Sequence, residues 1–133
     1  MYDAIGRGIG ILDEAMQSKV GAKAILVIMT DGQENASREF SHEKISALLK
    51  ARQEQGWLVT FLGEGLEVSR QGTNLGTYAG SVAAYAGGAG LRAAGRVLAA
   101  SSLRYAKAAG DIRGAQAKAA LTPEERDALA GKT

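Results

Sequence analysis

The chain has 133 residues, of which 46% are hydrophobic, so it is long and apolar enough for one domain with a single core. It contains no cysteine, which excludes a disulfide framework, a thiolate metal site and a cysteine nucleophile. The net charge is only +2, and no apolar run approaches the roughly 18 to 20 residues that span a bilayer, so we expect a cytoplasmic protein without membrane contact.

The first segment, Tyr2–Gln17, is predicted to be an amphipathic helix. Its apolar residues Ile5, Ile9, Leu12 and Met16 recur at helical spacing. Three glycines at positions 6, 8 and 10 each weaken a helix by about 1 kcal/mol relative to alanine. We therefore expect this helix to be held by packing or by the close approach of a neighbour.

The next segment is an apolar run, residues 24–29, that ends in Thr30 and Asp31. Its length and β-branched residues predict a strand buried on both faces, as in parallel sheets covered by helices. Ligands of such sheets collect at the carboxyl ends of the strands. Asp31 is therefore the first candidate for a functional side chain.

A second helix and a second strand follow. Ser41 is a good N-cap for a helix that ends near Gly56, with His42 expected to face solvent in its first turn. Trp57–Leu62 then repeats the buried-strand pattern, and we expect it to lie parallel and adjacent to the first strand. A short helix around Leu66 and Val68 and a weak third strand over residues 80–85 complete this part.

The remainder is predicted to be helical. Residues 87–90 are expected to form a flexible joint, and a helix to about Ala109 would use the inner face Leu91, Ala94, Leu98, Ser102 and Tyr105, with Gly95 on the same side. Residues 110–121 give no clear element. Thr122, Pro123 and Glu125 form a capping-box pattern for a short last helix that ends at Gly131.

These elements predict a three-layer α/β fold: a partial doubly wound, Rossmann-like parallel sheet of about three strands, with helices on both faces. We expect residues 1–88 to form this α/β domain and residues 89–133 an Ala/Arg-rich helical tail that packs on it or extends from it. Residues 89–118 carry six Lys/Arg against Asp111 alone, a net of +5.

Three stretches of the chain carry a resemblance to a known family. Residues 2–5, residues 25–37 with Thr30-Asp31-Gly32, and residues 56–63 resemble, in this order, the C-terminal half of a von Willebrand factor A domain of the bacterial or phage type. The resemblance covers roughly residues 2–85. It implies a doubly wound sheet with a metal-ion-dependent adhesion site at its carboxyl edge.

In that family, Mg²⁺ is held by an Asp-x-Ser-x-Ser motif, by a threonine just before the helix that begins here at Tyr2, and by the aspartate of Thr-Asp-Gly. This chain has only the last of these, Asp31; the motif is missing and the threonine position falls before Met1. One carboxylate binds Mg²⁺ weakly, even if Glu34 assists. We therefore expect Mg²⁺ only if another chain completes the site.

The resemblance also implies that the strand at residues 24–30 lacks its usual neighbour. An apolar strand with an unpaired edge invites another chain to add on. We expect an interface at Ile25, Val27 and Met29, reached by dimerisation edge to edge or by a strand from a partner; alternatively, the numbering begins inside a longer protein. Of these outcomes we favour self-association.

The predicted function is a non-enzymatic protein-binding or self-assembly module of the von Willebrand A type, with an incomplete metal site and no catalytic residues. One alternative is a small nucleotide- or metal-dependent enzyme that uses the carboxyl edge of the sheet. The other is a nucleic-acid-binding protein that uses the basic tail, although we favour an amphipathic helix whose arginines lie in water or pair with the acidic front half of the chain.

Overall fold

The computed structural model describes residues 1–19, 21–32 and 37–132. The elements in chain order are α1 (Tyr2–Met16), β1 (Ile25–Thr30), α2 (His42–Glu54), β2 (Leu58–Glu64), α3 (Gly65–Asn74), the 3₁₀ turn η1 (Ala79–Ser81), β3 (Val82–Tyr85), α4 (Gly87–Lys107), α5 (Ile112–Ala119) and α6 (Pro123–Leu129).

The three strands form one parallel sheet in the order β1-β2-β3. Ile25 lies beside Leu58 at the start of β1, and Thr30 lies beside Gly63 at its end. β2 is therefore the central strand, and all of its residues except Glu64 are buried. Because β1 and β3 each pair on one side only, both are edge strands of the described sheet.

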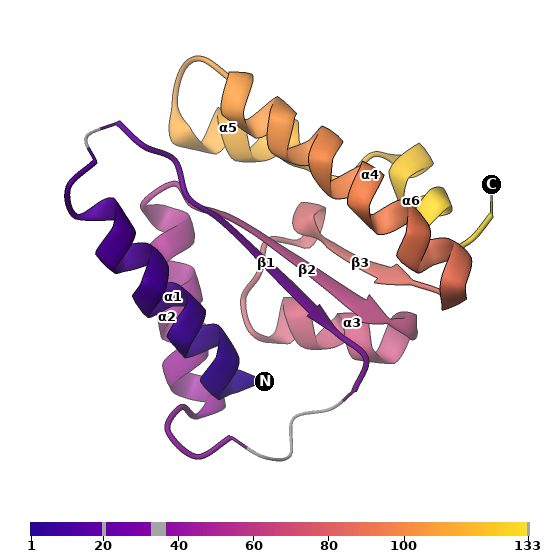
Figure 1. The fold of residues 1–133 in the computed structure, drawn as a ribbon, viewed down its shortest axis with the longest axis horizontal. Helices are drawn as coiled ribbons and strands as arrows, with labels where there is room; N and C mark the ends of the chain where they lie inside the picture. Colours follow the sequence, from indigo (N-terminus) through magenta and orange to yellow (C-terminus); the bar gives the residue numbers. More distant parts are fainter. Residues whose placement is uncertain (20, 33–36, 133) are drawn as a thin grey trace.

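Helices cover both faces of this sheet (Figure 1). Val59 and Phe61 of β2 point into the cluster formed with α1 and α2, and α3 lies on the same face because its Gly72 abuts the Phe61 ring. Leu58 and Leu62 point to the opposite face, into clusters formed with α4, α5 and α6. The structure thus confirms the predicted three-layer α/β fold with a parallel sheet and a helical C-terminal part.

Local signals account for several element boundaries. The Ser41 hydroxyl accepts a hydrogen bond from the Lys44 N–H at 3.2 Å, as expected for an N-cap. At the start of α6, Thr122 and Glu125 form the complete capping box that the sequence predicts. Within the described residues, no helix combines the length and apolar character that a membrane crossing requires.

The prediction that β1 is buried on both faces is wrong for this chain. Of its apolar residues only Ile28 is buried, and the Val27 and Met29 side chains are each 39% exposed. The physical reason is that β1 is an edge strand with a neighbour on one side only. A continuous apolar run indicates that a strand favours burial, but it does not show whether other residues of the same chain cover the strand.

Two expectations for the C-terminal part are also wrong. Residues 87–90 begin α4 instead of forming a joint, since Gly90 is packed against the Leu129 carbonyl of α6. The inner face of α4 is rotated, so Leu91 is 55% exposed and Gly95 faces open space. Residues 110–121, where the sequence indicates no clear element, contain α5, which begins at an Asp111 N-cap that accepts a hydrogen bond from the Gly114 N–H at 2.7 Å.

Candidate functional site

The unpaired edge of β1 is the most unusual surface of the described chain. The Leu58 N–H donates to the Ala24 carbonyl at 3.0 Å, which fixes the phase of the parallel ladder between β1 and β2. Hydrogen-bonding residues alternate along a parallel strand, so Leu26, Ile28 and Thr30 direct their backbone groups to β2. The N–H and C=O groups of Ile25, Val27 and Met29 therefore point away from the sheet.

The side chains of these three residues lie on one face of the sheet, together with Leu58 and Leu62. Ile25 packs on the cluster around Tyr105, whereas Val27 and Met29 stay partly exposed. In Figure 1, β1 runs between α1 and α4, and no other element passes in front of it. The structure thus brings together the three residues that the sequence predicts as an interface.

A groove of about 340 Å³ runs along this edge. Its walls come from Met1, Ala4 and Ile5 at the start of the chain and from residues 26–32 of β1 and the turn that follows. Among the described residues that line it, Asp31 at one end has the only charged side chain. The groove is therefore lined by uncharged side chains along the strand and has a carboxylate where the strand stops.

Asp31 is exposed at the carboxyl edge, on the same side of the sheet as Glu64 and Tyr85. Burial, with further contributions from Glu64 and Asp31, raises the pKa of the Tyr85 hydroxyl. Within the described residues, no group of three or more His, Cys, Asp or Glu side chains is placed to hold a metal ion. Glu34, the suggested assistant, lies outside the described residues.

Asp3, in the first turn of α1, holds residues 38–40 in place beside the groove. The sequence did not predict this role. The Asp3 carboxylate accepts hydrogen bonds from the N–H groups of Arg38, Glu39 and Phe40 at 2.9 to 3.0 Å. These bonds, led by the one from Arg38, hold the pKa of Asp3 below its usual value. The position of Asp3 in the first turn of α1 was the only available sequence signal.

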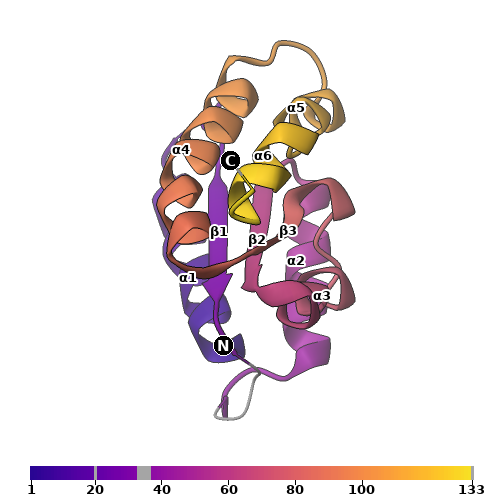
Figure 2. The same ribbon diagram turned by 90° about the vertical axis from the view of Figure 1, so that its right-hand side faces the viewer.

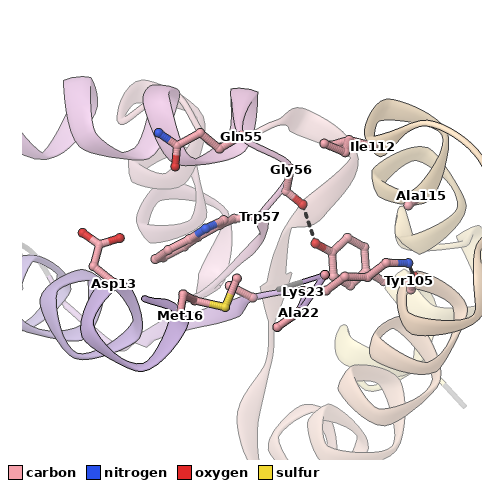
Figure 3. Close-up of a pocket in the computed structure, with 12 residues that line it drawn as sticks. Asp13, Met16, Ala22, Lys23, Gln55, Gly56, Trp57, Tyr105, Ile112 and Ala115 are labelled. Atoms are coloured by element: carbon pink, nitrogen blue, oxygen red, sulfur yellow. Dashed lines mark hydrogen bonds between the residues drawn. The ribbon is translucent and has the colours of Figure 1, made fainter. Parts of the chain in front are cut away.

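A second cavity, of about 440 Å³, lies at the opposite, amino edge of the sheet (Figure 3). Its charged groups already have partners: Asp13 accepts two hydrogen bonds from Arg52, at 2.9 and 2.7 Å, and Lys23 donates to the Tyr105 and Ala108 carbonyls, both at 3.0 Å. The Tyr105 hydroxyl donates to the Gly56 carbonyl. The Asp13–Arg52 pair joins α1 to α2, whereas the Lys23 and Tyr105 contacts attach the end of α4 to the sheet.

The basic stretch is partly structural. Arg104 forms an ion pair with Glu125 at 2.7 Å and also donates to the Lys118 carbonyl at 2.8 Å, at the end of α5. Arg92, Arg96 and Lys107 are exposed. His42 is half-buried, and its ring contacts the Tyr2 ring edge-on at a centroid distance of 5.9 Å, so the expectation that it faces solvent holds only in part.

Comparison with known proteins adds no relative. No family model matches the chain, and no curated protein and no solved structure matches it either. The likeness to the von Willebrand A family therefore remains a resemblance carried by the residues quoted above, and the function has to be argued from the geometry of this chain.

Proposed function

We propose that this chain is a non-enzymatic protein-binding module that accepts an added strand along the open edge of β1. The observation that carries the proposal is the outward direction of the backbone groups of Ile25, Val27 and Met29, next to two exposed apolar side chains. Strand addition satisfies such backbone groups and buries the apolar side chains in one step.

The sequence of β1 supports this proposal. Edge strands that must remain unpaired are commonly protected by charges, by proline or by bulges. Residues 24–30 contain no charged residue and no proline, and the pairing with β2 runs from Ile25 to Thr30 without interruption. This edge therefore lacks the usual devices against the addition of a strand.

The metal-dependent version of the function is a narrower proposal that rests on the resemblance. Asp31 supplies one carboxylate at the end of the open strand. Mg²⁺ prefers about six oxygen ligands, and one carboxylate with waters holds it weakly, so a partner would have to bring further oxygen ligands to this edge. On this reading, Mg²⁺ strengthens the binding of a partner and is not bound tightly by this chain alone.

A peptide-binding experiment tests the proposal. The probe is a labelled, end-blocked peptide with the sequence of residues 23–31, titrated at low micromolar concentration and followed by fluorescence anisotropy. We expect saturable binding that Val27→Lys abolishes, because the lysine places a charge in the apolar edge. Leu66→Lys is the matched control, since Leu66 is 67% exposed on α3, away from β1.

Amide hydrogen exchange supplies the second measurement. Binding should slow the exchange of the Ile25, Val27 and Met29 amides, whereas the Leu26 and Ile28 amides are already protected by β2. Peptide binding that survives Val27→Lys, or that leaves the three outward amides unchanged, would overturn the proposal.

A further inference from the structure

We propose that the strand accepted by β1 is β1 of a second copy of this chain, paired antiparallel about a two-fold axis that passes beside Val27. This inference rests on the proposed function and adds the identity and the register of the partner. The two sheets would join into one sheet of six strands.

The backbone fits this register. In an antiparallel pair, outward-facing residues of one strand exchange hydrogen bonds with outward-facing residues of the other. With the axis at Val27, this residue pairs with Val27 of the second copy, and Ile25 pairs with Met29 of the second copy. Each pair exchanges two hydrogen bonds, about six in all. The apolar side chains meet on the same face of the joined sheet.

The charges at the two ends of the strand fit the same register. Lys23 and Asp31 lie four residues before and four residues after Val27. The two-fold axis therefore places Lys23 of each copy opposite Asp31 of the other, where the two charges attract although the Lys23 ammonium keeps its hydrogen bonds to the Tyr105 and Ala108 carbonyls of its own chain. Asp31 has no ion-pair partner among the described residues of its own chain. An antiparallel register shifted by two residues would leave these charges as diagonal neighbours about 7 to 8 Å apart instead of directly opposite.

The flank of α1 beside the open edge is also free of charge. Gly6 and Asp13 lie on the α2 side of the helix: Gly6 contacts Phe40, just before α2, and Asp13 pairs with Arg52 of α2. The opposite side of the helix carries four small or apolar residues at helical spacing, namely Ala4, Gly8, Ile11 and Ala15. The one large side chain among them, Ile11, is 68% exposed. Nothing in the described chain covers this large side chain, Ile11.

The flank of α4 beside the edge has the same character. α4 lies on the β1 side of α6 (Figure 2), and Gly90 packs against the Leu129 carbonyl of α6. Leu91 and Gly95 lie on the flank that points away from α6, where Leu91 is 55% exposed and a Cβ on Gly95 would meet no atom within 4 Å. Both helices beside β1, α1 and α4, therefore have an uncharged and partly exposed side next to the open edge.

Small residues are what a second copy requires at these positions. Paired strands lie only about 4.8 Å apart, whereas packed helices are 8 to 10 Å apart, so joining the strands forces the helices on each face together. A Cβ on Gly8 would lie 3.5 Å from the Leu26 side chain, which places Gly8 close to the proposed axis. Because glycine has no side chain, two copies of α1 could approach each other closely at Gly8.

Disulfide trapping tests the register, because the natural chain has no cysteine. Residues that face each other as a hydrogen-bonded antiparallel pair have Cα atoms about 5.5 Å apart, within disulfide reach. We expect Val27→Cys to form a covalent dimer under mild oxidation. Ile25→Cys alone should not, although a mixture of Ile25→Cys and Met29→Cys should form a mixed dimer.

Sedimentation equilibrium over a range of concentrations tests the association itself. Gly8→Arg should abolish the dimer, because two arginines would meet at the axis. Gly10→Arg is the matched control: it changes the helix in the same way, but Gly10 faces open solvent and the dimer should persist. Asp31→Lys should weaken the dimer by about three- to tenfold, and less at high salt.

The outcomes separate the two proposals. A chain that remains monomeric at high concentration but binds the peptide of residues 23–31 keeps the proposed function and refutes the second copy as partner. A dimer that Val27→Lys disrupts, but that Val27→Cys does not trap, refutes the register. A dimer that neither Val27→Lys nor Gly8→Arg disturbs refutes both proposals.

Discussion

Leu129→Ala should destabilise the whole domain, although Leu129 lies only four residues from the end of the chain. Its side chain has no exposed surface and packs in the cluster that contains Leu62 of β2, Tyr85 of β3 and Val97 of α4. Removing buried leucine atoms costs about 2 to 5 kcal/mol, depending on how far the site collapses. Because the neighbours belong to the sheet and to the longest helix, we expect about 3 kcal/mol.

Urea denaturation measures this cost. With a slope of about 1.5 kcal/mol per molar urea, the midpoint should fall by about 2 M. Trp57 is the only tryptophan and lies in the cluster on the other face of the sheet, so its fluorescence reports unfolding far from the substitution. A change below 0.5 kcal/mol, or a fluorescence transition that does not follow the loss of helical circular dichroism, would show that residues 89–133 are a loosely attached tail.

Three further substitutions test other contacts. Tyr105→Phe should cost about 1 to 2 kcal/mol in urea denaturation, because the Gly56 carbonyl loses its buried donor; no measurable cost would refute this hydrogen bond. Asp3 has a lowered pKa, so its contribution to stability is complete above its unfolded pKa of about 3.8 and is lost as the pH falls through the lower folded value. Asp3→Asn should therefore lower the stability at pH 7 and flatten its acid dependence, and an unchanged acid profile would contradict the assignment. Gly8→Ala should raise the melting temperature, because alanine stabilises a helix by about 0.5 to 1 kcal/mol relative to glycine. Gly6→Ala should lower the melting temperature, because a Cβ at position 6 would clash with the Phe40 ring.

The elements with a strong local signal could be predicted from the sequence. β1 follows an uninterrupted apolar run, β2 is an apolar run broken only by Thr60 before Gly63 and Glu64, and α2 and α6 begin at the Ser41 and Thr122 caps. α5 was missed because Ile112 is its only large apolar residue, which leaves no apolar stripe, and because its N-cap, Asp111, follows a glycine in a stretch that resembles a loop. The start of α4 was missed because its glycines suggest a joint, whereas Gly90 is needed in the helix for close packing against the Leu129 carbonyl of α6, a contact between residues distant in the sequence.

The candidate site could be predicted only in part. The position of β1 and its unpaired edge follow from the apolar run and from the resemblance. The role of Asp3 could not be predicted, since its three N–H donors lie about 35 residues away along the chain. The uncharged flanks of α1 and α4 were also not predicted, because which side of a helix faces an open edge depends on how the layers pack.

The most direct test of the open edge is amide exchange of β1 in dilute solution, residue by residue. The structure predicts an alternating pattern: slow exchange at Leu26, Ile28 and Thr30, whose amides face β2, and fast exchange at Val27 and Met29, whose amides face outward. Raising the protein concentration should slow the outward amides selectively. Uniform protection along β1 at the lowest concentration, in a chain shown to be monomeric, would contradict the account.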